Sequence, residues 1–283
     1  MTTTGFNTRS IGEERTVREA VDFAVESGIG ALELDGRHLW QDHLSRGEIR
    51  HMKSQAARHG IQYSIHHPQA TFPATHDPER RARHDAEMEG TMRLAHDLGS
   101  RVIVLHLGGI DYPGVEAARA SEQVRLEAVE NAAEFLLRAA PKAEAYGVTI
   151  AVENLLNRPG DVTRTYAELA DVVRRLDSPV VGITLDTGHA QRTEGIDSAF
   201  ETFREDLRHL HVHDCVDGVD HHELGRGDLD LARYEEILRA RPVLLVLEVG
   251  KGAVLALETG QDPRGVVLRS VAAVKRMLGD LAA

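Results

Sequence analysis

The chain has 283 residues, and its 45 Asp and Glu against 33 Lys and Arg give a formal net charge of −12. This acid excess argues against a nucleic-acid partner, and the single Cys excludes a disulfide framework or a thiolate metal cage. The first residues lack the basic and apolar stretches of a secretory signal, and no apolar run is long enough to span a bilayer. We therefore expect a soluble cytoplasmic protein without a membrane partner.

Short apolar runs alternate with longer stretches of helical period along the whole chain. The predicted strands are residues 5–7, 31–34, 61–66, 102–106, 148–153, 180–186, 209–214 and 243–249. A predicted helix follows each strand, at residues 16–27, 45–60, 77–98, 116–146, 165–176, 198–207, 231–240 and 263–278. No linker or break in composition separates these units, so residues 1–283 are expected to form one domain.

The pattern of these units predicts the fold class. Strands 102–106, 148–153 and 243–249 are almost continuously apolar, which is typical of parallel strands that are covered on their faces. Eight strand–helix units in 283 residues match the size of a (β/α)8 barrel. A doubly wound open sheet is the competing fold, but no glycine-rich phosphate fingerprint follows the first strand. We therefore predict an α/β fold, a single (β/α)8 TIM barrel.

In such a barrel the chemistry lies where each strand ends and its loop begins. Residues able to bind a metal or transfer a proton follow most of the predicted strands: Glu33, Asp35, His66, His67, His106, Glu153, Asn154, Asp186, His189, His211, His213, Asp214 and Glu248. They would converge over one mouth of the barrel, whereas a chance pattern would scatter some to the opposite end. Glu33 is equally well explained as a surface residue or a helix cap.

Two of these carboxylates are difficult to explain as structural residues. Glu153 and Glu248 each follow a strand of buried type, where an unpaired carboxylate is costly. With Asp186 and His211 they make a candidate site for one divalent cation, built from three carboxylates and an imidazole. Such a set suits Mn²⁺ best, with Mg²⁺ and Co²⁺ as alternatives, and Zn²⁺ as another because further histidines are near.

Five segments carry a resemblance to a known family. AVENL, TLDTGHA, HLHVHD, HHELGRGDLD and LVLEV, in this order and spacing, resemble the xylose isomerase-like TIM-barrel superfamily. That superfamily holds sugar isomerases and epimerases, inosose dehydratases and endonuclease IV-type abasic-site nucleases. The resemblance covers essentially the whole chain, and it implies that the family's shared metal ligands are Glu153, Asp186, His211 and Glu248. It also implies that His189 contacts substrate, as in the epimerases, or a second metal, as in the nucleases.

Further residues near the mouth are candidate substrate contacts. They are Trp40, His66, His67, His106, His189, His213, His221 and His222. The resemblance places His221 or His222 in a loop that faces the pocket, whereas Trp40 either walls the pocket or covers the barrel rim. GRG at 225–227 and GKG at 250–252 follow the last two strands, where many barrels bind phosphate, so a sugar phosphate is one candidate substrate.

The resulting hypothesis is a metal-dependent isomerase or epimerase of a sugar, sugar phosphate or related polyol, acting in carbohydrate metabolism. Glu153 and Glu248 would be the acid and base, and the ion would stabilise the enediolate formed by removing a proton next to a carbonyl. One departure matters. Ketohexose 3-epimerases carry an Arg shortly after the strand-seven His, whereas this chain has CVDGVD at 215–220, which argues against a free ketohexose.

Two alternatives remain open. An endonuclease IV-like abasic-site nuclease would use a multi-metal ligand set resembling His66 or His67, His106, Glu153, Asp186, His189, His211, Asp220, His222 and Glu248. The charge of −12 opposes this alternative, because a duplex binder needs Lys and Arg for its phosphate contacts. An inosose dehydratase-like lyase would use the same metal and the same proton removal. Barrels of this group often pair, so a homodimer is a further expectation.

Overall fold

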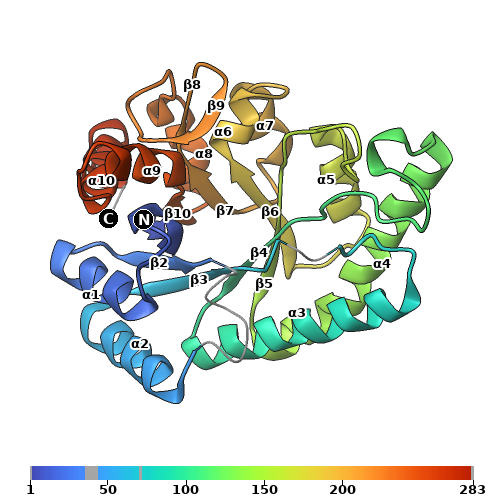
Figure 1. The fold of residues 1–283 in the computed structure, drawn as a ribbon, viewed down its shortest axis with the longest axis horizontal. Helices are drawn as coiled ribbons and strands as arrows, with labels where there is room; N and C mark the ends of the chain where they lie inside the picture. The colour runs from blue at the N-terminus through green and yellow to red at the C-terminus, as the bar shows by residue number, and fades with distance from the viewer. Residues whose placement is uncertain (1, 36–43, 70–71, 282–283) are drawn as a thin grey trace.

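The computed structural model describes residues 2–35, 44–69 and 72–281. Eight parallel strands close into a barrel in the order β1-β10-β7-β6-β5-β4-β3-β2 (Figure 1). They are Thr3–Asn7 (β1), Ala31–Leu34 (β2), Gln62–His66 (β3), Val102–Leu105 (β4), Thr149–Glu153 (β5), Val181–Asp186 (β6), Leu207–Val212 (β7) and Leu244–Leu247 (β10). The predicted (β/α)8 TIM barrel is confirmed.

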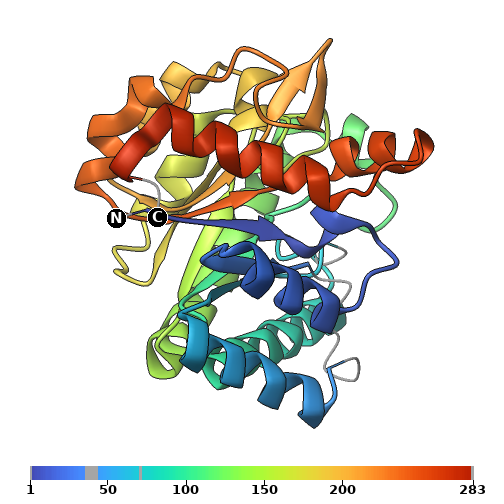
Figure 2. The ribbon, with the colours of Figure 1, turned by 90° about the vertical axis from the view of Figure 1, so that its left-hand side faces the viewer.

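Helices surround the barrel on its outside, as the two perpendicular views show (Figures 1 and 2). The α-helices are Val17–Ser27 (α1), Arg46–His59 (α2), Pro78–Leu98 (α3), Glu122–Tyr146 (α4), Tyr166–Arg174 (α5), Thr187–Gln191 (α6), Ile196–Phe203 (α7), Glu235–Ala240 (α8), Gly250–Glu258 (α9) and Arg264–Leu278 (α10). Short 3-10 helices are Thr8–Ile11, Ala117–Arg119, Leu231–Tyr234 and Gly279–Leu281. Among the described residues, none of the helices combines the length and the apolar character that crossing a membrane requires.

Local sequence explains where the helices begin and end. Thr16 and Glu19 form a reciprocal capping box at the start of α1, since each side chain bonds the other residue's backbone N–H. Ser45 and Glu48 do the same for α2. Helix α2 ends at Gly60, whose φ of 73° lies in the left-handed region that glycine adopts without steric cost. These signals confine each helix to the span between two strands.

Successive side chains of a strand point to opposite faces, and the two faces of these strands differ in chemistry. The helix-facing layer is apolar, and its strand residues include Leu32, Ile65, Ile103, Val152, Leu185 and Leu210. The inner face is polar toward the carboxyl ends of the strands, where it carries the buried residues Glu33, Ser64, His66, Glu153, Asp186, His209 and His211. The helix-facing layer is therefore the main apolar core, and the inner face is where a site can be built.

The structure differs from the predicted elements in the region after β7. The seventh strand runs over Leu207–Val212 rather than 209–214, so the prediction that Leu207 ends a helix is wrong. Asp214 instead begins a hairpin of β8 (Asp214–Val216) and β9 (Val219–His222), which was not predicted from the sequence. Residues 250–252, expected in a loop, form the first turn of α9. The segment 116–146 divides into a 3-10 turn and α4.

Candidate functional site

Four side chains meet at the carboxyl end of the barrel and form what we term the candidate metal centre. Glu153 ends β5, Asp186 ends β6, His211 lies on β7 and Glu248 directly follows β10. One potential ligand atom from each lies within 4.8 Å of the others, and all four residues are buried. The four metal ligands expected from the sequence are thus adjacent, although they are spread over almost a hundred residues of chain.

The ring of His211 tests whether this centre fits a cation. Both of its ring nitrogens are buried without a hydrogen bond to the described residues, and of the two it is Nδ1 that faces the carboxylates of the centre. It lies 3.3 Å from Glu248 Oε2, 3.5 Å from Glu153 Oε1 and 3.9 Å from Asp186 Oδ2. Ligand atoms about 2.1 Å from a shared cation are about 3.0–3.4 Å apart in octahedral or tetrahedral geometry. The centre therefore has the donor set and nearly the spacing that a divalent cation requires.

The charges at this centre favour a cation among the carboxylates. Burial by itself raises the pKa of Glu153, but the charges of His106 and His211 outweigh burial and hold that pKa well below its ordinary value. The pKa of Glu248 is likewise lowered, to about 2, because His211 outweighs burial. Burial lowers the pKa of His211, yet the surrounding carboxylates raise it well above its ordinary value. A metal ion would supply the positive charge that His211 otherwise carries as a proton.

Neighbouring side chains hold Asp186 in place. Its Oδ1 caps helix α6 by accepting a hydrogen bond from the backbone N–H of His189 at 2.6 Å. His213 Nε2 lies 2.8 Å from Asp186 Oδ2, and His213 Nδ1 accepts the backbone N–H of His221 at 2.8 Å. Because Nδ1 accepts, Nε2 carries the hydrogen and donates it to Asp186. His213 thus links the β8–β9 hairpin to the candidate metal centre.

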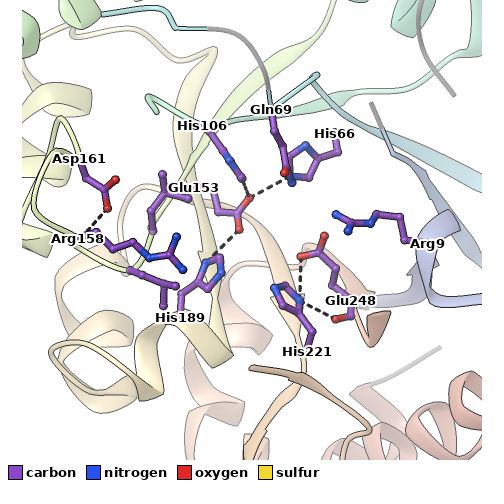
Figure 3. A pocket seen from close by; sticks show the side chains of 12 residues that line it. Arg9, His66, Gln69, His106, Glu153, Arg158, Asp161, His189, His221 and Glu248 are labelled. Carbon is purple, nitrogen blue, oxygen red and sulfur yellow. Dashed lines mark hydrogen bonds and ion pairs between the residues drawn. The ribbon is translucent and has the colours of Figure 1, made fainter. Parts of the chain in front are cut away.

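A cavity of about 260 Å³ opens over the centre (Figure 3). Its lining residues include Arg9, His66, His106, Glu153, Arg158, His189, His221 and Glu248. Figure 3 shows the carboxylates of Glu153 and Glu248 pointing into the same space from different strands. Both residues belong to the candidate metal centre as well, so any ligand in the cavity would lie directly against it.

The expected substrate contacts divide into two groups. His66, His106, His189 and His221 line the cavity. His67 does not, because its Nδ1 pairs with Thr91 Oγ1 of α3 at 2.9 Å, on the helix side of the barrel. His213 lies behind Asp186, and His222 lines a separate surface cavity beside Arg226. Trp40 lies outside the described residues.

Three cavity histidines share one hydrogen-bonding pattern. The Nδ1 atoms of His66, His189 and His221 lie 2.9, 3.0 and 3.0 Å from backbone carbonyl oxygens, so each Nδ1 carries the hydrogen. In a neutral ring Nε2 then has the lone pair, the usual arrangement of a metal-binding histidine. Nε2 of His66 lies 3.3 Å from Glu153 Oε2, and Nε2 of His189 lies 4.0 Å from Asp220 Oδ2. Two further candidate clusters contain these rings and lie beside the centre: His66 with His106 and Glu153, and His189 with Asp220 and His221. His221 also forms a cluster with His213 and Glu248.

The β8–β9 hairpin brings Asp220 and His221 to the mouth. Its two-residue turn consists of Asp217 and Gly218, with φ values of 51° and 75°. Positive φ at both positions is characteristic of the tight type I′ turn. His221 also has a positive φ, 59°, an uncommon conformation for a histidine that places the residue between His213 and Glu248.

Asp214 accounts for the GRG segment at 225–227. Its carboxylate accepts hydrogen bonds from the backbone N–H groups of Gly225, Arg226 and Leu229. A Cβ atom at Gly227 would lie 2.6 Å from the carbonyl oxygen of Cys215, so only glycine fits there. Two of the three N–H groups of the GRG segment, those of Gly225 and Arg226, are thus already bonded to Asp214.

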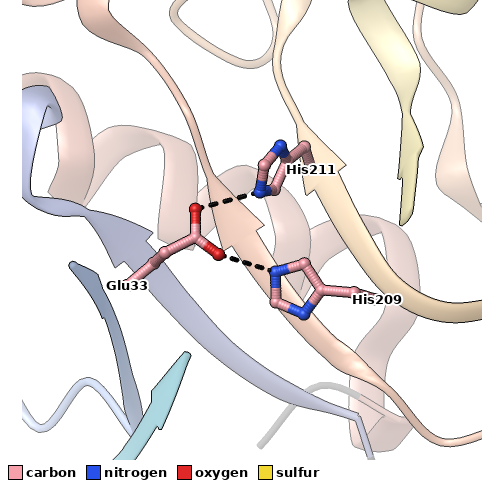
Figure 4. Close-up of side chains that lie close together, drawn as sticks. All are labelled: Glu33, His209 and His211. Atoms are coloured by element: carbon pink, nitrogen blue, oxygen red, sulfur yellow. Dashed lines mark hydrogen bonds and ion pairs between the residues drawn. The ribbon is translucent and has the colours of Figure 1, made fainter. Parts of the chain in front are cut away.

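Arg9 and His209 were not predicted as site residues, and Glu33 was predicted as a strand-end candidate that is equally well explained as a surface residue or a helix cap. Arg9 lies in the turn after β1 and lines the cavity. Glu33 and His209 lie on the inner face beneath the centre, both fully buried and 2.9 Å apart (Figure 4). The position of Glu33 at the end of β2 was a signal for a site residue, but its partner is 176 positions away in the chain.

Comparison with known proteins gives a consistent assignment of the fold. The model of the xylose isomerase-like TIM barrel family matches residues 21–271. An uncharacterized protein of Methanocaldococcus jannaschii is 27% identical over 222 residues, which are 76% of this chain and 70% of that protein. A probable endonuclease 4 of Halorhodospira halophila is 26% identical over 205 residues, 66% of this chain and 66% of that protein.

Among solved structures, D-psicose 3-epimerase of Clostridium cellulolyticum H10, crystallised with D-tagatose, is similar to this chain. It superposes with a TM-score of 0.80 over 98% of this chain and 99% of its own. The sequence identity is 20%. At this identity the likeness concerns the fold, and the substrate has to be argued from the site itself.

Proposed function

The chain belongs to the xylose isomerase-like TIM barrel family, and on that basis we propose that it is a divalent-metal-dependent epimerase or isomerase of a sugar or related polyol. One observation carries the proposal: Glu153 and Glu248 belong to the same four-residue cluster and also line the same cavity. Two carboxylates that reach one small cavity from different strands are suited to removing a proton and returning it elsewhere.

The proposed chemistry begins with a substrate that has a hydrogen on the carbon next to a carbonyl. A bound divalent ion would polarise that carbonyl and stabilise the negative charge of the enediolate. One of the two glutamates removes the proton, and the other returns a proton to the opposite face or to the neighbouring carbon. His106, 2.8 Å from Glu153 Oε2, orients that carboxylate. Arg9 and Arg158 supply N–H donors for substrate hydroxyls.

The test combines metal analysis with a substrate panel in D₂O. Mn²⁺-loaded protein is incubated with ketoses, aldoses and keto-inositols, both free and phosphorylated, and the products are followed by NMR. We expect one metal ion per chain and an epimer or isomer carrying solvent deuterium on one carbon. Loss of water, with formation of an alkene or diketone, would identify a lyase instead. Protein that binds no divalent ion, or that is active in a chelator, would contradict the proposal.

A specific observation favours a second candidate, a multi-metal phosphodiester hydrolase of the abasic-site nuclease type. The two clusters that flank the centre, with His66, His189 and His221 each presenting Nε2, would allow two further ions to bind. The likeness to a probable endonuclease 4 agrees with this candidate. The net charge of −12 opposes it, because duplex binding depends on neutralising phosphates.

Metal stoichiometry separates the two candidates. Zinc is added to the metal-free protein, and bound zinc is counted after gel filtration. One tightly bound ion supports the epimerase or isomerase. Three ions, together with metal-dependent cleavage of an oligonucleotide duplex carrying one abasic site, would replace it with the hydrolase. The Asp220→Asn variant is a control, since it alters one flanking cluster and leaves all four residues of the candidate metal centre in place.

A further inference from the structure

A buried carboxylate lies directly beneath the candidate metal centre. Glu33 projects from β2 into the barrel and is fully buried. Figure 4 shows its two oxygens directed at the rings of His209 and His211, both on β7. Strands β2 and β7 are not neighbours in the barrel, because β1 and β10 lie between them. Glu33 therefore bridges the barrel interior rather than pairing within a ladder.

Each oxygen of Glu33 has two partners. Oε1 accepts a hydrogen bond from Asn7 Nδ2 at 3.0 Å and lies 2.9 Å from His211 Nε2. Oε2 accepts one from Ser64 Oγ at 2.9 Å and lies 2.9 Å from His209 Nε2. Asn7 and Ser64 are the residues opposite Glu33 on the two adjacent strands, so the ladder register positions them. Four polar partners around one buried carboxylate leave it little freedom to move.

This arrangement determines which nitrogen of the His211 ring carries the hydrogen. A ring nitrogen 2.9 Å from a carboxylate oxygen carries the hydrogen, because two facing lone pairs would repel each other. In a neutral imidazole the other nitrogen, Nδ1, then has the lone pair. That nitrogen is the one that faces the three carboxylates of the candidate metal centre.

We propose that Glu33 is a positioning residue: through its 2.9 Å contact with Nε2 of His211, it presents Nδ1 of that ring to the metal ion. His209 contacts the other oxygen of the same carboxylate, so both inward-facing histidines of β7 have a role on the inner face. This inference rests on the proposed metal-dependent function, and it adds that the buried carboxylate controls how tightly the ion binds. Partners of this kind commonly change metal affinity about 10- to 100-fold when removed.

The first test uses the unaltered chain. The protein is labelled with ¹⁵N-histidine and loaded with ¹¹³Cd²⁺, and the coupling between cadmium and each histidine nitrogen is measured by NMR. The resonances of His211 are assigned with the His211→Gln variant. We expect coupling to Nδ1 of His211 and a protonated Nε2. Coupling to Nε2 would overturn the proposal while leaving metal binding, and with it the proposed function, intact. Protein that binds no divalent ion would overturn both.

The second test compares metal affinity among variants, using the visible absorption of Co²⁺ during titration of metal-free protein. We expect Glu33→Ala to weaken Co²⁺ binding about 10- to 100-fold. Glu33→Gln keeps an oxygen that can accept from Nε2–H, so it should retain most of the affinity. Ser64→Ala removes one partner of Glu33 without touching His211, and it should bind like the wild type.

The outcomes of the titration are distinct. Wild-type affinity in Glu33→Ala, or equal losses in Glu33→Ala and Ser64→Ala, would overturn the proposal, because neither result depends on the contact with His211. A loss in Glu33→Gln as large as that in Glu33→Ala would also overturn it, since charge rather than position would then matter. Circular dichroism checks that each variant folds. If Glu33→Ala does not fold, Glu33→Gln and the cadmium experiment decide.

Discussion

The two faces of the barrel strands differ in chemistry, and the difference shows how one strand can serve both the core and the site. The helix-facing layer is apolar, whereas the inner face carries buried carboxylates and imidazoles toward the carboxyl ends of several strands. On β7 the contrast occurs within four residues, since His209 and His211 face inward whereas Leu210 and Val212 join the apolar core. A shift of register by one residue would exchange the two sets, so the burial of the leucines also determines where the histidines point.

The two faces contribute to different properties: the helix-facing layer to the free energy of folding, and the inner face to metal binding and catalysis. Burial of apolar surface in the helix-facing layer is the main source of folding free energy. The inner face instead gathers buried carboxylates whose mutual repulsion is relieved by histidines or a cation. We therefore expect substitutions on the inner face to alter turnover or metal binding and substitutions in the helix-facing layer to alter the free energy of unfolding.

The largest expected effect is on turnover. We expect Glu153→Gln and Glu248→Gln each to lower kcat about 10²- to 10⁴-fold on a substrate identified by the deuterium screen, because an amide cannot transfer the proton. The melting temperature should stay close to that of the wild type. The control is Glu236→Gln on the exposed surface of α8. Wild-type turnover in either active-site variant would remove the two-glutamate mechanism.

A substitution in the helix-facing layer should lower the free energy of unfolding and leave metal affinity unchanged. Leu136 on α4 is fully buried, and we expect Leu136→Ala to lower the free energy of unfolding by about 2–5 kcal/mol, measured by denaturant titration. Its neighbour Leu137 is 54% exposed, so Leu137→Ala should cost less than about 0.5 kcal/mol. Metal affinity of the folded protein should not change in either variant. A weakened metal site in Leu136→Ala would show that the two faces are coupled.

Much of this arrangement could be predicted from the sequence because position along a strand is locally encoded. Glu153 and Glu248 each follow an apolar run, and in a parallel barrel all such positions meet at one mouth. The depth of a residue within the barrel is not encoded in this way. His209, His211 and His213 share one face of the chain, yet they differ in depth: His209 contacts Glu33 beneath the candidate metal centre, His211 belongs to the centre, and His213 contacts Asp186 from behind. Alternation alone cannot distinguish them.

Two features were missed for different reasons. Asp217 and Gly218 are a strong local signal for a two-residue hairpin, but the predicted seventh strand, 209–214, ends too late and leaves the segment after it as a loop. The position of Glu33 at the end of β2 marked it as a candidate, but its role depends on β7, which lies far away in the chain. Contacts across a barrel interior arise only when the barrel closes.

A glycine near the mouth offers a sharper test of how the inner face is supported. A Cβ atom added at Gly188 would lie 2.0 Å from His213 Cε1, so Gly188→Ala must displace the ring that holds Asp186. We expect divalent metal affinity to fall about tenfold or more, as for the loss of a partner that orients a ligand. Calorimetric titration with Mn²⁺ measures this change. Gly250→Ala, at a position with open space, is the matched control, and equal affinities in the two variants would contradict the expectation.

The smallest effect concerns the end of the barrel opposite the mouth, where α2 ends and β3 begins. Gly60 has a φ of 73°, which costs an alanine about 1 kcal/mol, so Gly60→Ala should lower the free energy of unfolding by that amount. Gly47 lies in the same helix, with neither a positive φ nor a steric conflict for a Cβ atom. Gly47→Ala should therefore raise the free energy of unfolding by up to about 0.5–1 kcal/mol. Denaturant titration of both variants measures the two signs. Metal affinity should be equal in both, because neither glycine contacts the inner face. Weaker metal binding by folded Gly60→Ala would mean that strain at Gly60 reaches the candidate metal centre. Folding stability and metal affinity would then not be independent.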